Sequence, residues 1–493
     1  MKARNKAAAL ILIGSVFSCT DLHKDPIGLL TPEQISTDPT LNSVTLSVTT
    51  SYQMLASTLN LLNEWRWDLG TVFRNDFIVD DIASDDVQKK WNPDGDQAWM
   101  DQVQSFNFTA SNQAFNGQWS YDYEGISRAN LAISYLTDAA ITTKIGIDPT
   151  VKNRLLGEVY FLRAFYYFDL VNNFGDVPLV LKPLSNFGEA YSVAKRETRA
   201  NVYAQISADL AQAKTLLPNS KFADPVEHWR ASKGAVLALQ AKVALYNQKW
   251  TEVISTVTEL EGLNFYSLNP NYFDSFDVAK EATESEVIFD YDHQSLQNPR
   301  KGNGLCAPLD WGFIAPTTNF LAEFEANDPR LLYTVNVTDK AVYKLLGATN
   351  TSYKGNDDAP SNKIYIRFAD VLLWKAEAYN EAGNYPQAIL IINSIRNRAR
   401  TSVAVGGGMP PVGTLPDRAA SVDKAQIKGW LVHERRVELG FESQRFADLR
   451  RWSTAKAVLT AVGKNFQDRN YLYPIPQSEI DKSGGSITQN PGY

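Results

Sequence analysis

Residues 368–379 read Phe-Ala-Asp-Val-Leu-Leu-Trp-Lys-Ala-Glu-Ala-Tyr, and the chain continues through Glu381-Ala-Gly-Asn384 to a second apolar run that begins at Tyr385. Apolar side chains recur at helical spacing on both sides of the short turn, so this stretch predicts two antiparallel helices. Small alanines on the first helix let the second helix approach closely, and the aromatic residue after the turn fills the space between them. This is the design of a tetratricopeptide unit.

Two further stretches are also strongly helical. Residues 235–246 (Ala-Val-Leu-Ala-Leu-Gln-Ala-Lys-Val-Ala-Leu-Tyr) lead through Asn247-Gln-Lys249 to Trp250 and a second apolar run, which repeats the same helix–turn–helix pattern. Residues 153–172 are apolar nearly all round, as expected of a helix in the core of a large domain. Gly175 allows this helix to end. The chain is therefore predicted to be mostly α-helical.

The segments between these helices are rich in turn residues, and we expect loops and short strands in them. They hold much of the aspartate, asparagine and glycine, and comprise residues 70–117, 264–328, 340–363 and an exposed loop at 401–422.

The composition excludes several classes of protein. The chain has 493 residues, enough for three domains or one large one, and its formal net charge is −7. No basic stripe is present, so nucleic acid is not an expected ligand. Two cysteines cannot form a disulfide framework, and four scattered histidines with no pair at ligand spacing argue against a zinc site. We expect no metal and no cofactor, and a calcium site made of carboxylates alone is the alternative that the sequence leaves open.

The first 18 residues have the features of a secretory signal. A basic start is followed by an apolar run far shorter than a membrane span and by a small residue, Ser18. Val16-Phe17-Ser18-Cys19 resembles the lipobox of bacterial lipoproteins, in which the cysteine is acylated. Plain secretion with an incidental cysteine is the alternative. We therefore expect a signal peptide at 1–18, lipidation of Cys19 and a polar tether over 19–40.

Five blocks in order along the chain resemble the SusD/RagB family of surface lipoproteins, which capture nutrients in Bacteroidota-type bacteria. Ser443 is a small departure, since the family usually has glycine there. The blocks are Leu162-Arg-Ala-Phe-Tyr-Tyr-Phe-Asp-Leu-Val-Asn-Asn-Phe-Gly-Asp-Val-Pro-Leu179, Ile366-Arg-Phe-Ala-Asp-Val-Leu-Leu-Trp-Lys-Ala-Glu-Ala378 with Ile395-Arg-Asn-Arg-Ala399, Glu434-Arg-Arg-Val-Glu-Leu-Gly-Phe-Glu-Ser-Gln-Arg-Phe-Ala-Asp-Leu-Arg-Arg-Trp452, Tyr473-Pro-Ile-Pro-Gln477 and Gln489-Asn-Pro-Gly-Tyr493.

The resemblance implies a SusD-like α-helical fold, with tetratricopeptide-like helix pairs and with irregular loops and short strands that form the ligand-binding side. It implies one body over 41–493, with an N-terminal half at 41–230 and a C-terminal half at 231–493. It also implies no enzymatic activity, attachment to the cell-surface side of the outer membrane by lipid, and a TonB-dependent β-barrel of the SusC type as partner.

The candidate ligand site is an early cluster of tryptophans among polar residues. A flat aromatic ring beside carboxylate and guanidinium groups offers a sugar both an apolar surface and hydrogen-bond partners. Core packing is the alternative for each of these tryptophans, and it is strongly favoured for Trp119. The candidates in this cluster are Trp65, Trp67, Arg74, Asp76, Trp91 and Trp99.

Trp311 joins these candidates, because it lies in a glycine-rich loop that is poorly placed for a helical core, and because family pockets tend to combine an early and a middle loop. Tyr291 and His293 are weaker candidates.

The expected function is binding of oligosaccharide or polysaccharide and its delivery to the partner barrel. An oligopeptide binder of the same family, a glycoside hydrolase and a purely structural scaffold are the alternatives. A catalytic pair such as Glu438 and Glu442 is disfavoured, because mixed charge on a helix is more often ion-paired or solvated.

Overall fold

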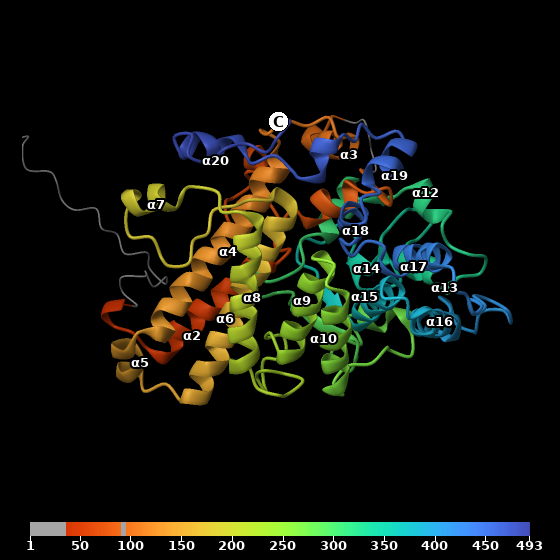
Figure 1. Ribbon diagram of the computed structural model, residues 1–493, viewed down its shortest axis with the longest axis horizontal. Helices are drawn as coiled ribbons and strands as arrows, with labels where there is room; N and C mark the ends of the chain where they lie inside the picture. The colour runs from red at the N-terminus through yellow and green to blue at the C-terminus, as the bar shows by residue number, and fades with distance from the viewer. Residues whose placement is uncertain (1–35, 90–94) are drawn as a thin grey trace, which may run out of the picture.

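The computed structural model describes residues 36–89 and 95–493. The predicted signal peptide, Cys19, most of the tether and Trp91 lie outside the described residues. Within them the chain is mostly helical, as expected, and Figure 1 shows helices stacked side by side across the long axis of the molecule.

The N-terminal half is built around α6 (Pro149–Phe174), which packs against α4 (Gln113–Thr137) and α8 (Arg199–Leu216). The side chain of Asp148 accepts hydrogen bonds from two backbone N–H groups of the first turn of α6, and Pro149 suits that first turn. The helix ends at Gly175, whose φ is 76°. Most of its side chains are buried, which confirms the prediction of a core helix over 153–172.

Both predicted helix pairs are present. They are α9 (Lys233–Tyr246) with α10 (Trp250–Gly262), and α15 (Phe368–Glu381) with α16 (Tyr385–Thr401). The array continues from one half to the other because α8 packs on α9, α10 on α15, and α15 on α17 (Lys424–Leu439). The small and apolar faces of these helices form one continuous hydrophobic core.

Two short antiparallel sheets connect distant parts of the chain. β1 (Val87–Gln88) pairs with β3 (Ala315–Pro316), and β2 (Val287–Tyr291) pairs with β4 (Lys363–Arg367). β4 leads directly into α15, so the second sheet fixes the middle of the chain to the start of the C-terminal helix pair.

The remaining helical elements surround this frame. They are α2 (Leu41–Tyr52), η1 (Gln53–Leu55), η2 (Trp67–Leu69), η3 (Phe77–Ile82), α3 (Ala98–Ser105), α5 (Ala139–Ile145), α7 (Phe187–Val193), η4 (Tyr272–Ser275), α11 (Cys306–Trp311), α12 (Thr318–Leu321), α13 (Pro329–Thr334), α14 (Tyr343–Leu346), α18 (Arg445–Arg451), α19 (Ala455–Ala461), η5 (Asp468–Tyr471) and α20 (Gln477–Lys482).

A buried ion network joins the second sheet to α17. The guanidinium of Arg367 lies 2.7 Å from a carboxylate oxygen of Glu286, 2.8 Å from one of Glu438 and 2.6 Å from one of Glu442. Asp370, in the first turn of α15, pairs with Arg435 of α17 at 2.8 Å. Glu438 and Glu442 are thus held by arginine within the core.

In residues 36–89 and 95–493, none of the helices has both the length and the apolar character needed to cross a membrane.

Candidate functional site

Two predicted site residues from distant loops meet in the structure. The ring centroids of Trp67 and Trp311 are 5.9 Å apart, and their planes are inclined by 61°. Both rings are partly exposed, and Trp65, two residues before Trp67, is 50% exposed. We call Trp65, Trp67 and Trp311 the aromatic surface.

Two buried phenylalanines form the layer behind this surface. Phe73 lies 5.6 Å from Trp67, and Phe313 lies 6.2 Å from Trp67 and 6.0 Å from Trp311, measured between ring centroids. Only 1–2% of either phenylalanine is exposed. The partly exposed rings therefore rest on core side chains, which limits the conformational freedom they could lose on binding a ligand.

Polar groups lie beside the aromatic surface. The backbone N–H of Trp65 donates to the side-chain oxygen of Asn60 at 2.9 Å, which supports the left-handed conformation of Trp65 (φ 44°). Arg66 and Asp68 form an exposed ion pair at 2.7 Å on either side of Trp67. The loop thus offers donors, acceptors and ring faces together.

The loop of Trp65 and Trp67 is anchored on α4 through a glycine. Gly70 has φ 68°, and a Cβ at this position would lie 2.1 Å from the carbonyl oxygen of Gln113. The side chain of Asn116 donates to the carbonyl of Leu69 at 2.7 Å, and that of Asn75 donates to the carbonyl of Gly70 at 3.0 Å. Only glycine combines this backbone conformation with so close an approach.

The loop of Trp311 is tied to the early part of the chain. The hydroxyl of Thr58 donates to the carbonyl of Gly302 at 2.9 Å, and the N–H of Gly304 donates to the carbonyl of Ser57 at 3.1 Å. Trp311 ends the short helix α11, where Gly312 (φ 85°) closes the turn. These hydrogen bonds place the two tryptophan loops next to each other.

Cys306, at the start of α11, is fully buried, and burial raises the pKa of its thiol to about 12. It is a small core residue.

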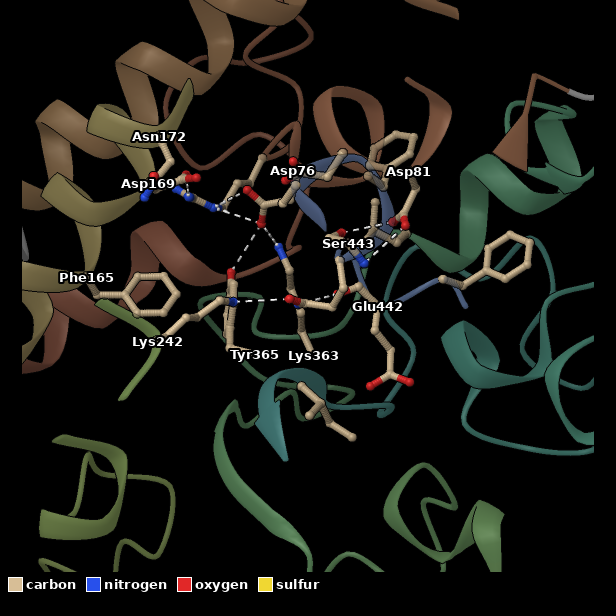
Figure 2. Close-up of a pocket in the computed structure, with 18 of the residues that line it drawn as sticks. Asp76, Asp81, Phe165, Asp169, Asn172, Lys242, Lys363, Tyr365, Glu442 and Ser443 are labelled. Atoms are coloured by element: carbon tan, nitrogen blue, oxygen red, sulfur yellow. Dashed lines mark hydrogen bonds and ion pairs between the residues drawn. The ribbon is translucent and has the colours of Figure 1, made fainter. Parts of the chain in front are cut away.

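Arg74 and Asp76 lie in the interior. Arg74 is 1% exposed and lies 2.8 Å from Asp76, 2.7 Å from Asp122 and 2.6 Å from Asp169. Burial by itself would raise the pKa of Asp76, but the guanidinium of Arg74 and the ammonium of Lys363 outweigh it and hold that pKa below its usual range. Figure 2 shows Asp76, Lys363 and Asp169 around this network.

Arg74 and Asp76 also line an internal cavity of about 130 Å³. It lies where η3, α6, β4 and the loop before α18 meet (Figure 2). In its wall, Asp81 accepts hydrogen bonds from the backbone N–H of Ser443 at 3.0 Å and from the hydroxyl at 2.9 Å. Burial, opposed by these hydrogen bonds, raises the pKa of Asp81 to about 7. The cavity is small, its lining combines charged side chains with apolar ones, and it shares no lining residue with the aromatic surface.

The other candidates are buried. Trp99 is 7% exposed in α3, and its indole N–H donates to the side chain of Gln97 at 2.7 Å. Trp119 lies in the core of α4, as expected. Tyr291 and His293 are 8% and 2% exposed, and burial lowers the pKa of His293 to about 3.

The sequence analysis did not single out Phe73 or select Phe313 as support for the site. Both follow a candidate tryptophan in the same loop, Phe73 after Trp67 and Phe313 after Trp311, and this nearness was the available signal. No group of three or more His, Cys, Asp or Glu residues that could hold a metal ion is found in residues 36–89 and 95–493.

Two protein-family models match parts of this chain. Residues 332–493 match the family model described as "SusD family", and residues 37–245 match the model described as "Starch-binding associating with outer membrane". SusD-like protein P2 of Formosa agariphila is 26% identical and covers 99% of both chains, and SusD-like protein P38 of the same organism is 28% identical over 75% of this chain and 78% of that one.

Solved structures have the same fold. Surface glycan-binding protein A from Bacteroides fluxus matches with a TM-score of 0.75 at 24% identity, covering 92% of this chain and 100% of the other. A laminarin-binding SusD-like protein matches with a TM-score of 0.71 at 23% identity, covering 92% and 98%. Surface glycan-binding protein A from Bacteroides thetaiotaomicron, solved with laminarihexaose, matches with a TM-score of 0.69 at 20% identity, covering 92% and 99%.

Proposed function

The chain belongs to the SusD/RagB family, whose members are non-catalytic glycan-binding proteins, and from this premise we propose that it binds a glycan chain at the aromatic surface. The observation that carries the proposal is the meeting of Trp67 and Trp311 at 5.9 Å beside the exposed ring of Trp65. Trp67 and Trp311 come from two distant loops and keep part of their rings exposed although they pack against the core, and Trp65 lies two residues from Trp67.

Sugar rings have an apolar C–H face and a rim of hydroxyl groups. The inclined rings of Trp67 and Trp311 would contact the C–H faces, while Arg66 and Asp68 would reach hydroxyl groups. Each ring contact would contribute about 1 kcal/mol beyond the burial of apolar area, by analogy with aromatic pairs. Several such contacts give an affinity that retains a long glycan and still permits its release.

We further propose that Cys19 carries lipid, that residues 19–40 tether one body spanning 41–493 to the outer membrane, and that the bound glycan passes to a TonB-dependent barrel of the SusC type. Arg74, Asp76 and Trp99 then contribute indirectly, by stabilising the loops and helices behind the aromatic surface. One structural neighbour is a laminarin-binding protein and another was solved with laminarihexaose, so laminarin is the first glycan to test.

The test is affinity electrophoresis of the purified protein in gels that contain laminarin or other soluble polysaccharides. We expect one glycan to retard the protein, and Trp65→Ala or Trp311→Ala to relieve that retardation. Tyr191→Ala is the matched control for Trp65, because Tyr191 is an aromatic side chain on α7 with a similar exposure of 58%. Binding of a peptide mixture, with no glycan retarding the protein, would refute the proposal.

A further inference from the structure

A second cleft shares no lining residue with the aromatic surface. It has a volume of about 540 Å³ and lies between the segment 221–232, which precedes α9, and the segment 281–294, which contains β2. Val226, which is 84% exposed, and the exposed His228 both line the cleft. The cleft therefore opens to solvent.

One side of this cleft is aromatic. The rings of Phe222 and His228 stack at 3.9 Å between centroids with an inclination of 6°, and Trp229 follows directly. The ammonium of Lys301 lies 5.4 Å from the centroid of Trp229 and 3.0 Å from a carboxylate oxygen of Asp292. The cleft thus already holds one ammonium group between an aromatic ring and a carboxylate, an arrangement that favours organic cations.

Two further carboxylates that line the cleft, those of Glu281 and Asp290, accept hydrogen bonds from one residue, Asn362. The backbone N–H of Asn362 donates to Glu281 at 3.2 Å, and its side-chain amide donates to Asp290 at 3.0 Å. Both carboxylates belong to residues that line the cleft. Across the described ranges, neither carboxylate pairs with a lysine or arginine, in contrast to Asp292.

Burial raises the pKa of both carboxylates. Burial, with the carboxylate of Asp290 adding to it, raises the pKa of Glu281 to about 8. Burial, followed by the charges of Asp292 and Glu284, raises the pKa of Asp290 to about 7. A cation placed between Glu281 and Asp290 would relieve this repulsion, whereas an anionic group would add to it. The aromatic side of the cleft and the ammonium of Lys301 already seated beside Trp229 favour an organic cation.

We propose that this cleft is a second binding site, in which Glu281 and Asp290 receive the protonated amino group of an amine-bearing ligand such as a glucosamine unit. The apolar part of the ligand then lies against Trp229 and the stacked pair of Phe222 and His228. The site is independent of glycan binding at the aromatic surface and uses different chemistry, namely charge-assisted hydrogen bonds.

The test is isothermal titration calorimetry of the full chain with a glucosamine tetramer and with its N-acetylated counterpart, which has the same rings without the charge. We expect the glucosamine tetramer to bind at least about 10-fold more tightly. The double variant Glu281→Gln/Asp290→Asn keeps an acceptor for both hydrogen bonds from Asn362 and should lose that preference. Glu479→Gln/Asp481→Asn removes the same two charges on α20 and should retain it.

Trp311→Ala separates this site from the aromatic surface. It should leave glucosamine binding unchanged even if it removes binding of a neutral polysaccharide. Equal binding of the two tetramers, no binding of either, or an equal loss in the two double variants would overturn the proposal. Loss of glucosamine binding in Trp311→Ala would also overturn it, since the ligand would then occupy the aromatic surface.

Discussion

Gly70→Ala should destabilise the protein and weaken glycan binding through the same contact. The substitution puts a side chain into a left-handed backbone conformation, which costs roughly 1–2 kcal/mol. The new methyl group would also meet the carbonyl oxygen of Gln113, 2.1 Å from the ideal Cβ position, and overpacking of this kind typically adds about 1–3 kcal/mol. The expected loss of unfolding free energy is therefore about 2–5 kcal/mol.

The measurement compares Gly70→Ala with Gly146→Ala. Gly146 has a similar φ of 59° but has no atom within 4 Å of its ideal Cβ, so it isolates the backbone cost from the steric cost. For a chain of this size the entropy of unfolding is about 1 kcal/mol per kelvin, so Gly70→Ala should lower Tm by about 2–5 °C and Gly146→Ala by about 1–2 °C.

The same two proteins would then be compared in glycan-containing gels. Relief of the contact should displace the loop that carries Trp65 and Trp67, so retardation should fall for Gly70→Ala alone. Equal Tm values for the two variants, together with unchanged retardation, would refute the reasoning that this glycine positions the aromatic surface.

Two further predictions concern buried charge. Arg367→Met removes one cation from a buried network in which Arg330, Arg398 and Lys344 remain, and it should cost about 3–5 kcal/mol in urea unfolding. Arg66→Met, at an exposed pair, should produce no measurable change. Similar midpoints for the two variants would contradict the importance of the buried network. The pKa of Asp81 is raised from 3.8 to about 7 in the folded state. Between these two pH values the folded state therefore binds more protons than the unfolded state. The stability contributed by Asp81 consequently falls as pH rises through this window, by up to about 4 kcal/mol. Asp81→Asn can keep its contacts with Ser443 and should flatten the decline between pH 4 and pH 7; an unchanged pH profile would show that Asp81 ionises normally.

The helices were readable from the sequence because their signals are local. Residues 235–262 and 368–401 carry helical periodicity, small residues and an aromatic after a short turn, and each pair forms as predicted. The role of Arg74 was not readable, because its partners Asp122 and Asp169 lie on α4 and α6 and become neighbours only after the helices pack. Polar residues in a turn-rich segment look exposed until such partners are known.

The candidate site was predictable only in part for the same reason. Trp311 and Trp67 could be proposed separately, since each lies in a turn-rich loop, but their contact depends on hydrogen bonds between segments far apart in the chain. Trp99 lies in an equally turn-rich region and is buried, because α3 packs its ring inward. The local composition does not distinguish these outcomes.

The hydrogen bonds from Thr58 to Gly302 and from Gly304 to Ser57 have a consequence for the order of events during folding. They close a very long loop, and contacts of such sequence separation form late because the entropy of closing the loop must be overcome first. The aromatic surface therefore does not exist in a partly synthesised or partly folded chain, although its early tryptophans are already present. Capacity to retain a glycan should appear only with the completed fold, so the ligand site itself reports that both halves of the chain have come together.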